Sequence, residues 1–399
     1  MMNGTTRGNR VHIGIFGRTN SGKSSLINAL TNQKISIVSD VEGTTTDPVY
    51  KSMEFHPAGP VVFIDTAGFN DDTELGSARE NRTLDVIDET DVAILLFDEE
   101  KDLSMEAKWA EKLKAKNIPT IYVISKGDKK DRTSLEKSIK TRFKEIPIVV
   151  NGSDDRDALK EIRLKIGDAV TEDIKRESIL RDLISRESVV VLVMPQDIQA
   201  PKGRLILPQV QTIRELLDRK CIAVSTTLDN AEKTLTLVSD VAELIITDSQ
   251  CFKTVKDIRD KITPRVKLTS FSVLFSAFKG DIREFIRGAK AIDSLTENSK
   301  ILIAEACTHA PLEEDIGRVK IPNMLKKRFG SGLKIDVVSG NDFTENLEEY
   351  DLIIHCGACM FNRKYMMSRV DKAVEKEVPI TNYGVTIAQL LDILDDIVY

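Results

Sequence analysis

The stretch that most constrains the fold of this chain is GRTNSGKS at residues 17–24. It follows the apolar, strand-like run VHIGIF at 11–16 and leads into the helical pattern SSLINALTNQ. Strand, G-x-x-x-x-G-K-S/T loop and helix, in that order, form a P-loop. Gly17 and Gly22 let backbone N–H groups turn toward phosphate oxygens, and the helix N-terminus adds a positive field. The motif therefore predicts an α/β domain with a mostly parallel sheet and a phosphate site.

The rest of the chain repeats the α/β rhythm. Apolar runs alternate with charge-rich amphipathic stretches, which indicates mostly parallel sheets covered by helices. The 399 residues are more than one domain needs. We predict three α/β domains: the P-loop domain at 1–170, a small interface-building domain at 171–264, and a third domain at 265–399.

The apolar runs also predict individual elements. Residues 171–187, TEDIKRESILRDLISRE, combine charge with an i, i+3/i+4 apolar stripe and predict a linker helix. A second helix is expected at 210–219, and the third domain is expected to begin with a strand at 266–274. The remaining strands expected in the last two domains are 188–194, 221–225, 242–247, 301–304, 334–338, 352–354 and 378–380.

Composition excludes several classes of protein. A net charge of −6 and a pI of about 5.6 argue against a broad grip on nucleic acid. The apolar runs are too short to span a bilayer, and the first ten residues lack the apolar core of a secretion signal. Five cysteines in a chain of this length do not form a disulfide scaffold. We expect a cytoplasmic protein with no nucleic-acid or membrane partner.

Further segments complete a nucleotide site around the P-loop. Lys23 is expected to reach the β- and γ-phosphates, the Ser24 hydroxyl to ligate Mg²⁺, and the adjacent Ser25 to contact the nucleotide. Thr45, in GTTTD at 43–47, can complete the Mg²⁺ shell and sense the γ-phosphate. The strand at 61–64 ends in DTAG, where Asp65 is expected near the Mg²⁺ and Gly68 near the γ-phosphate.

The base specificity follows from SKGD at 125–128, after the strand at 121–124. In GTPases the last residue, here Asp128, accepts hydrogen bonds from N1–H and the exocyclic amine of guanine, and Lys126 belongs to the same motif. Ser125 stands where the usual motif has an asparagine, whose amide contacts guanine and braces the P-loop. We therefore expect GTP and GDP to bind with guanine preference but weaker affinity. A last nucleotide motif is placed at 150–153.

With these motifs in place, the first domain resembles the TrmE–Era class of GTPases. Phe69 stands where Ras-like enzymes carry a water-orienting glutamine. Members of the TrmE branch hold a K⁺ ion partly through a P-loop asparagine, and Asn20 occupies the matching place. The resemblance implies Mg²⁺-dependent GTP hydrolysis that K⁺ stimulates.

Two clusters of thiols and imidazoles lie in the third domain. Cys307 and His309 follow the strand at 301–304, and His355, Cys356 and Cys359 follow the strand at 352–354. About 45 residues separate the two clusters, enough for the strands to be neighbours. Three of five cysteines and two of four histidines gather here, which disfavours a mere core-filling role. The spacing suits either a structural zinc or an iron–sulfur cluster.

The C-x-H and H-C-x-x-C pair, behind a GTPase domain and a middle domain, resembles the HydF family of [FeFe]-hydrogenase maturation proteins. The resemblance covers the whole chain and implies that Cys307, Cys356 and Cys359 bind a [4Fe–4S] cluster. It also implies a middle domain that forms a homodimer, a diiron precursor built with two radical-SAM maturases, and transfer of that precursor to apo-[FeFe]-hydrogenase. Three thiolates leave one iron without a cysteine, and candidates for its fourth ligand are Glu305, His309 and His355.

Two other functions remain open on the residues alone. A cluster that gates GTP hydrolysis would make the chain a redox-sensing GTPase. A zinc ion in the same ligands would make it a zinc-stabilised GTPase adaptor.

Overall fold

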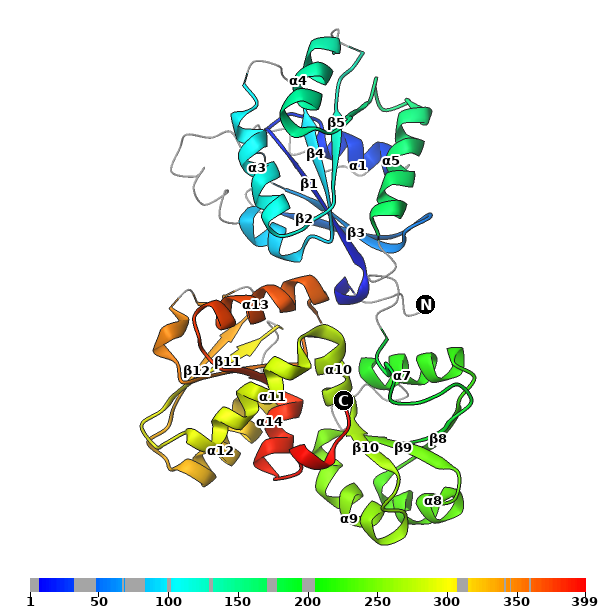
Figure 1. Ribbon diagram of the computed structural model, residues 1–399, viewed down its shortest axis with the longest axis vertical. Helices are drawn as coiled ribbons and strands as arrows, with labels where there is room; N and C mark the ends of the chain where they lie inside the picture. Colours follow the sequence, from blue (N-terminus) through cyan, green and yellow to red (C-terminus); the bar gives the residue numbers. More distant parts are fainter. Residues whose placement is uncertain are drawn as a thin grey trace. The chain divides into compact units, whose positions relative to one another are not determined.

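The computed structural model describes residues 7–31, 48–66, 68, 83–98, 102–128, 132–170, 178–195, 205–306, 315–340, 342–344, 346–358 and 360–399. The chain divides into two compact units, Met1–Arg176 and Glu177–Tyr399 (Figure 1). The first contains one sheet and the second contains two. The predicted α/β class with a mostly parallel first sheet is confirmed.

The first unit is built on a six-stranded sheet with strand order β2-β3-β1-β4-β5-β6. Every pairing is parallel except that of β2 with β3. All six residues of β4 are buried, as expected for a strand covered by helices on both faces. The strands are β1 Val11–Gly17, β2 Val49–Phe55, β3 Gly59–Asp65, β4 Val92–Phe97, β5 Thr120–Ile124 and β6 Ile148–Val149.

Helices cover both faces of this sheet. Figure 1 draws α1 and α5 on one side of the strands and α3 and α4 on the other. Buried side chains of α1 and α5 pack in one apolar cluster, and those of α3 and α4 pack in another. Because β1, β3, β4 and β5 run parallel, their carboxyl ends meet at one edge of the sheet. Open α/β sheets place their sites at this edge. The helices are α1 Lys23–Thr31, α3 Ser104–Ala115, α4 Thr133–Phe143 and α5 Arg156–Ala169, with a 3-10 turn at Arg7–Asn9 and a further helical stretch at 83–89.

The second unit begins with a parallel sheet in the order β10-β9-β7-β8, in which β8 is an edge strand. Its strands are β7 Val189–Val193, β8 Ile222–Thr226, β9 Ala242–Thr247 and β10 Lys267–Ser270. Its helices are α7 Leu207–Asp218, α8 Ala231–Val238 and α9 Phe252–Ile262, with 3-10 turns at Leu228–Asn230 and Ser249–Cys251.

A second parallel sheet follows, in the order β12-β11-β13-β14. One buried apolar cluster joins it to the preceding sheet, because Val191 and Leu268 belong to the same core as Ile301 and Ile353. The strands are β11 Lys300–Glu305, β12 Lys334–Ser339, β13 Leu352–His355 and β14 Ile380–Asn382. The helices are α10 Phe271–Lys279, α11 Ile282–Lys290, α12 Ile321–Phe329, α13 Arg363–Glu375 and α14 Tyr383–Leu390, with a π-helical turn at Ile316–Lys320 and 3-10 turns at Ala291–Ser294, Leu347–Glu349 and Leu394–Asp396.

The predicted linker helix at 171–187 is wrong over the part that the structure describes. Residues 178–187 form turns and bends. The Glu215 carboxylate accepts the backbone N–H groups of Ile179 and Leu180 at 2.7 and 3.3 Å. Arg181 and Glu187 adopt positive φ, which a right-handed helix excludes. A contact from α7 thus overrides the helical periodicity, while residues 171–177 lie outside the described ranges.

The strand predicted at 266–274 is confirmed at Lys267–Ser270 and wrong over 271–274, which belong to α10. The strand β10 ends at Ser270, whose hydroxyl accepts the N–H of Val273 at 3.2 Å and caps α10. Most side chains of α10 are apolar and buried, and a short apolar run does not by itself distinguish a buried helix from a strand. The strand β10 pairs with β9 and not with the third sheet. The other predicted strands occur within two residues of their expected ends.

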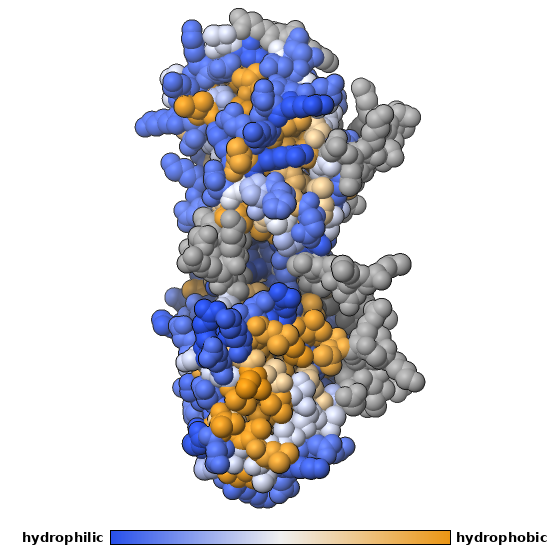
Figure 2. Space-filling view, turned by 90° about the vertical axis from the view of Figure 1, so that its right-hand side faces the viewer, coloured by the Kyte–Doolittle hydropathy of each residue, from blue (hydrophilic) through white to orange (hydrophobic). Residues whose placement is uncertain are grey.

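The second unit also exposes apolar side chains, including one on its edge strand. Ile222 of β8 is 58% exposed and Leu217 of α7 is 59% exposed, and Val210, Leu237 and Val241 are exposed as well. Figure 2 shows apolar surface gathered over the lower half of the face on whose side Figure 1 draws α7 and β8. None of the helices in the described ranges has the length and apolar character that crossing a lipid bilayer requires.

Candidate functional site

The P-loop connects the end of β1 to the first residue of α1. The Lys23 ammonium donates to the carbonyl oxygens of Gly17 and Arg18, both at 2.9 Å, and so lies inside the loop. Gly22 has φ +93°, a backbone conformation that favours glycine. Burial lowers the pKa of Lys23 to about 8, although the carboxylates of Asp65 and Asp98 oppose the shift. The structure therefore holds a desolvated cation where phosphate oxygens are expected.

Two of the residues expected around Mg²⁺, Ser24 and Asp65, are in contact at the end of β3. The Ser24 hydroxyl donates to the Asp65 carboxylate at 2.5 Å. Burial raises the pKa of Asp65, and the Ser24 hydrogen bond and the Lys23 charge oppose that shift. A hydroxyl and a carboxylate side by side are the hard oxygen ligands that Mg²⁺ prefers, so these residues fit the ion.

Gly68 passes close to the P-loop, as its predicted role requires. A Cβ at this position would lie 2.5 Å from the backbone nitrogen and Cα of Thr19. Only glycine therefore permits this approach. Thr45, the other predicted γ-phosphate sensor, lies outside the described residues.

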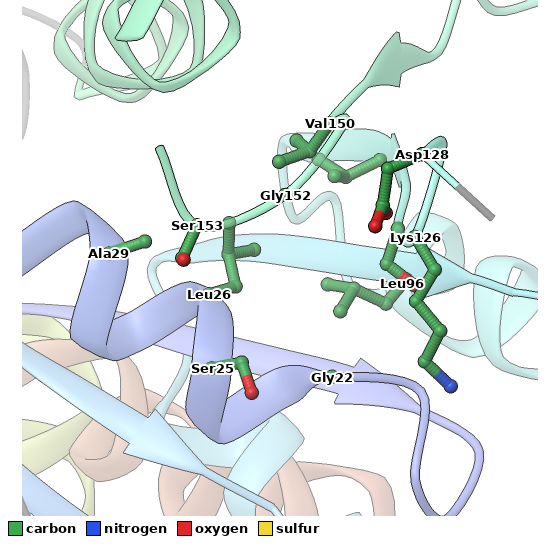
Figure 3. A pocket seen from close by; sticks show the side chains of 12 residues that line it. Gly22, Ser25, Leu26, Ala29, Leu96, Lys126, Asp128, Val150, Gly152 and Ser153 are labelled. Atoms are coloured by element: carbon green, nitrogen blue, oxygen red, sulfur yellow. The ribbon is translucent and has the colours of Figure 1, made fainter. Parts of the chain in front are cut away.

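A cavity of about 280 Å³ lies beside the P-loop (Figure 3). Lys126 and Asp128 line it from the segment after β5, and Ser25 lines it from the start of α1. The Lys126 ammonium donates to the Asn20 carbonyl at 2.5 Å and to Asp98 at 3.1 Å. The segment at 150–153 contributes Val150, Gly152 and Ser153 to the wall. The segments predicted to contact guanine thus line one cavity.

Ser125 makes one of the contacts that its substitution for asparagine was expected to remove. Its hydroxyl donates to the carbonyl of Ser21, within the P-loop, at 2.6 Å. The loop is therefore braced from β5 without an amide side chain. The neighbouring Asn20 is exposed and has φ +62°, a conformation that asparagine adopts more readily than most residues.

The two thiol clusters follow neighbouring strands, as predicted. Strands β11 and β13 pair in parallel, with Ala304 opposite His355. The Cys356 sulfur accepts the backbone N–H of Ala306 at 3.0 Å and that of Ala358 at 3.5 Å. Such donors stabilise a thiolate, the form of cysteine that binds metal, so Cys356 fits a metal ligand. Cys307, His309 and Cys359 lie outside the described residues.

Glu305 ends β11 and is held in a polar network. One carboxylate oxygen accepts from Arg318 Nε and Nη2 at 3.0 and 2.8 Å and from the Ser339 hydroxyl at 3.2 Å. The Tyr383 hydroxyl approaches the other oxygen at 3.5 Å. Glu305 can therefore ligate a metal through that first oxygen only if it releases these partners.

His355 is completely buried, and both of its ring nitrogens have partners. Nε2 lies 2.8 Å from Arg369 Nη1, and Nδ1 lies 2.9 Å from the Cys356 carbonyl oxygen. Because arginine can only donate, Nε2 is the acceptor and Nδ1 carries the proton. Burial and the Arg369 charge lower the pKa of His355 to about 3. The Nδ1–H group thus holds the Cys356 carbonyl in place, and neither ring nitrogen is available to a metal. Arg369 was missed by the sequence reasoning, because no motif includes it.

Three protein families match the chain. The family described as "Hydrogen maturase F dimerization domain" matches residues 179–280, and "Hydrogen maturase F tetramerization domain" matches 283–399. The family described as "50S ribosome-binding GTPase" matches residues 12–126, which include the P-loop and Asp65.

Among curated proteins, GTPase Der of Campylobacter concisus is 39% identical over 140 residues, which cover 34% of this chain and 30% of that protein. GTPase Der of Mycoplasmopsis pulmonis is 34% identical over 188 residues, 43% of each chain. The chain thus spans less than half the length of these relatives. Among solved structures, Aquifex aeolicus Era bound to GDP and aluminium fluoride is 19% identical, with a TM-score of 0.34 over 54% of this chain and 92% of that one.

Proposed function

The chain belongs to the hydrogen maturase F (HydF) family, and from that premise we propose that it is a GTP-hydrolysing scaffold that carries metal cargo to [FeFe]-hydrogenase. Its first domain is a GTPase domain of the TrmE–Era–Der class. Its two further family domains are dimerisation and tetramerisation domains, which indicate self-association. One observation carries the proposal. Cys356 follows β13 at the end of the sheet where the neighbouring strand β11 also ends, and its sulfur accepts a backbone N–H from the residue after β11. The same chain has a complete P-loop.

In the proposed hydrolysis, Lys23 would reach the β- and γ-phosphates and balance their charge. Ser24 and Asp65 would hold Mg²⁺, which neutralises charge that develops during phosphoryl transfer. Gly68 brings its backbone beside the P-loop, where a γ-phosphate would lie. Asp128 selects guanine, and the Ser125 hydroxyl fixes the loop against β5.

Asn20 is proposed to help hold a K⁺ ion that stimulates hydrolysis. GTP turnover is then expected to be faster in KCl than in NaCl at equal ionic strength. The variant Asn20→Ala should lose this difference and retain nucleotide binding. Equal rates in the two salts for the unmodified protein would rule out K⁺ stimulation.

At the thiol site, Cys307, Cys356 and Cys359 are proposed to hold a [4Fe–4S] cluster. Held by three thiolates, the cluster would supply one iron with an exchangeable ligand, at which a diiron precursor can attach. Glu305 and His309 remain the proposed fourth ligands, because both nitrogens of His355 have hydrogen-bond partners. Two radical-SAM maturases would supply the precursor, and apo-[FeFe]-hydrogenase would receive it.

The test is anaerobic iron–sulfide reconstitution followed by electron paramagnetic resonance of the dithionite-reduced protein. We expect a reduced-cluster signal in the unmodified protein that Cys356→Ser loses or alters. Cys251→Ser is the matched control, since Cys251 is buried in the apolar core, and it should keep the signal. About one tightly bound zinc per chain with no such signal would instead support the zinc-stabilised adaptor.

A further inference from the structure

We propose that Arg369 is a positioning residue that supplies a fixed positive charge near the backbone of Cys356. This charge offsets the negative charge of a metal centre bound to Cys356. Arg369 lies on α13, ten residues after Cys359 in the chain. The inference rests on the proposed function for the presence of a metal centre. It goes beyond that function in assigning the charge that the fold sets against this centre.

The burial of Arg369 is the first observation. Its side chain is only 2% exposed, yet it has no ion pair within 4.0 Å among the described residues. Nη1 donates to His355 and Nη2 donates to the Gly340 carbonyl, while Nε has no hydrogen-bond partner there. Burying a cation without an anion is costly, because the charge loses its hydration and gains no opposite charge in return.

Aromatic rings around the guanidinium explain how the fold tolerates it. The guanidinium carbon lies 4.7 Å from the ring centre of Phe361, 4.8 Å from that of Phe343 and 5.0 Å from that of Tyr365. The negative faces of such rings attract a cation. They offset part of the burial cost and fix the position of the charge, but they do not neutralise it.

Hydrogen bonds lead from this charge to the proposed metal ligand. Arg369 donates to His355 Nε2, and His355 Nδ1–H donates to the carbonyl of Cys356. The guanidinium is thus two hydrogen bonds from the Cys356 backbone, within a buried region where charges interact strongly. A cluster held by the Cys356 thiolate would supply the negative charge that the described surroundings of Arg369 lack.

The electrostatic consequence can be measured. Reduction adds negative charge to a cluster, so a nearby fixed positive charge favours the reduced form, and net charge is one of the factors that set cluster potentials. Replacing Arg369 with a neutral side chain should make the cluster harder to reduce. Replacing it with lysine should keep most of the effect.

The experiment compares the unmodified protein with Arg369→Gln and Arg369→Lys after cluster reconstitution. The midpoint potential is measured by a redox titration followed by electron paramagnetic resonance. Arg369→Gln is expected to lower the equilibrium constant for reduction about tenfold, equivalent to about 59 mV for one electron, with Arg369→Lys close to the unmodified protein. The matched control is Arg363→Gln, since Arg363 also lies on α13 but donates to the Phe278 and Gly280 carbonyls.

Each outcome decides the matter. An unchanged potential in Arg369→Gln, or an equal shift in Arg363→Gln, overturns the inference and leaves the proposed function intact. Failure of Arg369→Gln to retain iron, where Arg369→Lys retains it, supports the inference. If neither variant retains iron although both metal-free proteins have the circular dichroism of the unmodified one, charge is not the cause. No cluster in the unmodified protein would overturn the proposed function itself.

Discussion

Lys23 shows how one residue can make nucleotide binding depend on pH. Burial lowers its pKa to about 8, and a bound phosphate would favour the charged form. Binding above pH 8 must then include uptake of a proton. We expect GDP affinity to be constant below pH 8 and to fall at higher pH, approaching about tenfold per pH unit. Titration with a fluorescent GDP analogue from pH 6.5 to pH 9.0 measures this.

The control for that prediction is Lys23→Arg, because a guanidinium keeps its proton throughout this range. Its affinity is expected to differ from that of the unmodified protein and to vary little with pH. A flat profile for the unmodified protein, or the same fall in both proteins, would show that Lys23 is not the titrating group.

Local motifs are the basis of the proposed nucleotide residues, because Lys23, Ser24 and Asp128 lie in patterns whose spacing defines their roles. The hydrogen bond from Ser125 to Ser21 joins residues 104 positions apart. The contact between Arg369 and His355 depends on how α13 packs against β13. Neither contact has a local sequence pattern. The sequence showed serine in place of asparagine at 125, but not that the serine hydroxyl bonds to the P-loop. It likewise showed the cysteines, but not that Arg369 contacts the histidine beside Cys356.

At the scale of elements, prediction succeeded where burial and period agree. The strands at the sheet centres are apolar runs with clear ends, and they were located within two residues. The strand predicted over 271–274 was wrong because α10 is mostly apolar and buried, and a short apolar run suits a buried helix as well as a strand. The helix predicted over 178–187 was wrong for a different reason. The sequence has a helical period there, but the Glu215 carboxylate binds the backbone N–H groups and holds the segment in turns.

The edge strand β8 carries a prediction about self-association. It lies within the family's dimerisation domain, and Ile222 exposes 58% of its surface at the edge of the sheet. Burying an isoleucine side chain contributes about 1.5–3 kcal/mol. Ile222→Lys should therefore weaken the dimer by about tenfold or more, as measured by sedimentation across a concentration series.

Ile146→Lys is the control for this experiment, because Ile146 is 69% exposed but lies in the GTPase domain. It should leave the sedimentation profile unchanged. If Ile222→Lys sediments like the unmodified protein, the dimer does not use this edge of the sheet.

At the scale of the molecule, the two proposed sites belong to different compact units. The P-loop, Asp65 and Asp128 lie in Met1–Arg176, whereas Glu305, Cys356 and Arg369 lie in Glu177–Tyr399. Each site is assembled from contacts within its own unit. Iron binding should therefore not require a working GTPase site. In the proposed scaffold, GTP would act as a switch that changes which partner is held.

Ser24→Ala separates these roles. Loss of the predicted Mg²⁺ ligand is expected to reduce GTP turnover by about a hundredfold, the size of effect seen when one electrostatic contact is removed from a transition state. Iron content and the cluster signal should stay at the level of the unmodified protein, because the variant leaves every described contact of the thiol site in place. Hydrogenase activation in a defined maturation assay should fall with the GTP turnover. Activation at the normal rate would rule out the switch while leaving the scaffold role intact, and loss of iron would show that the two units act as one.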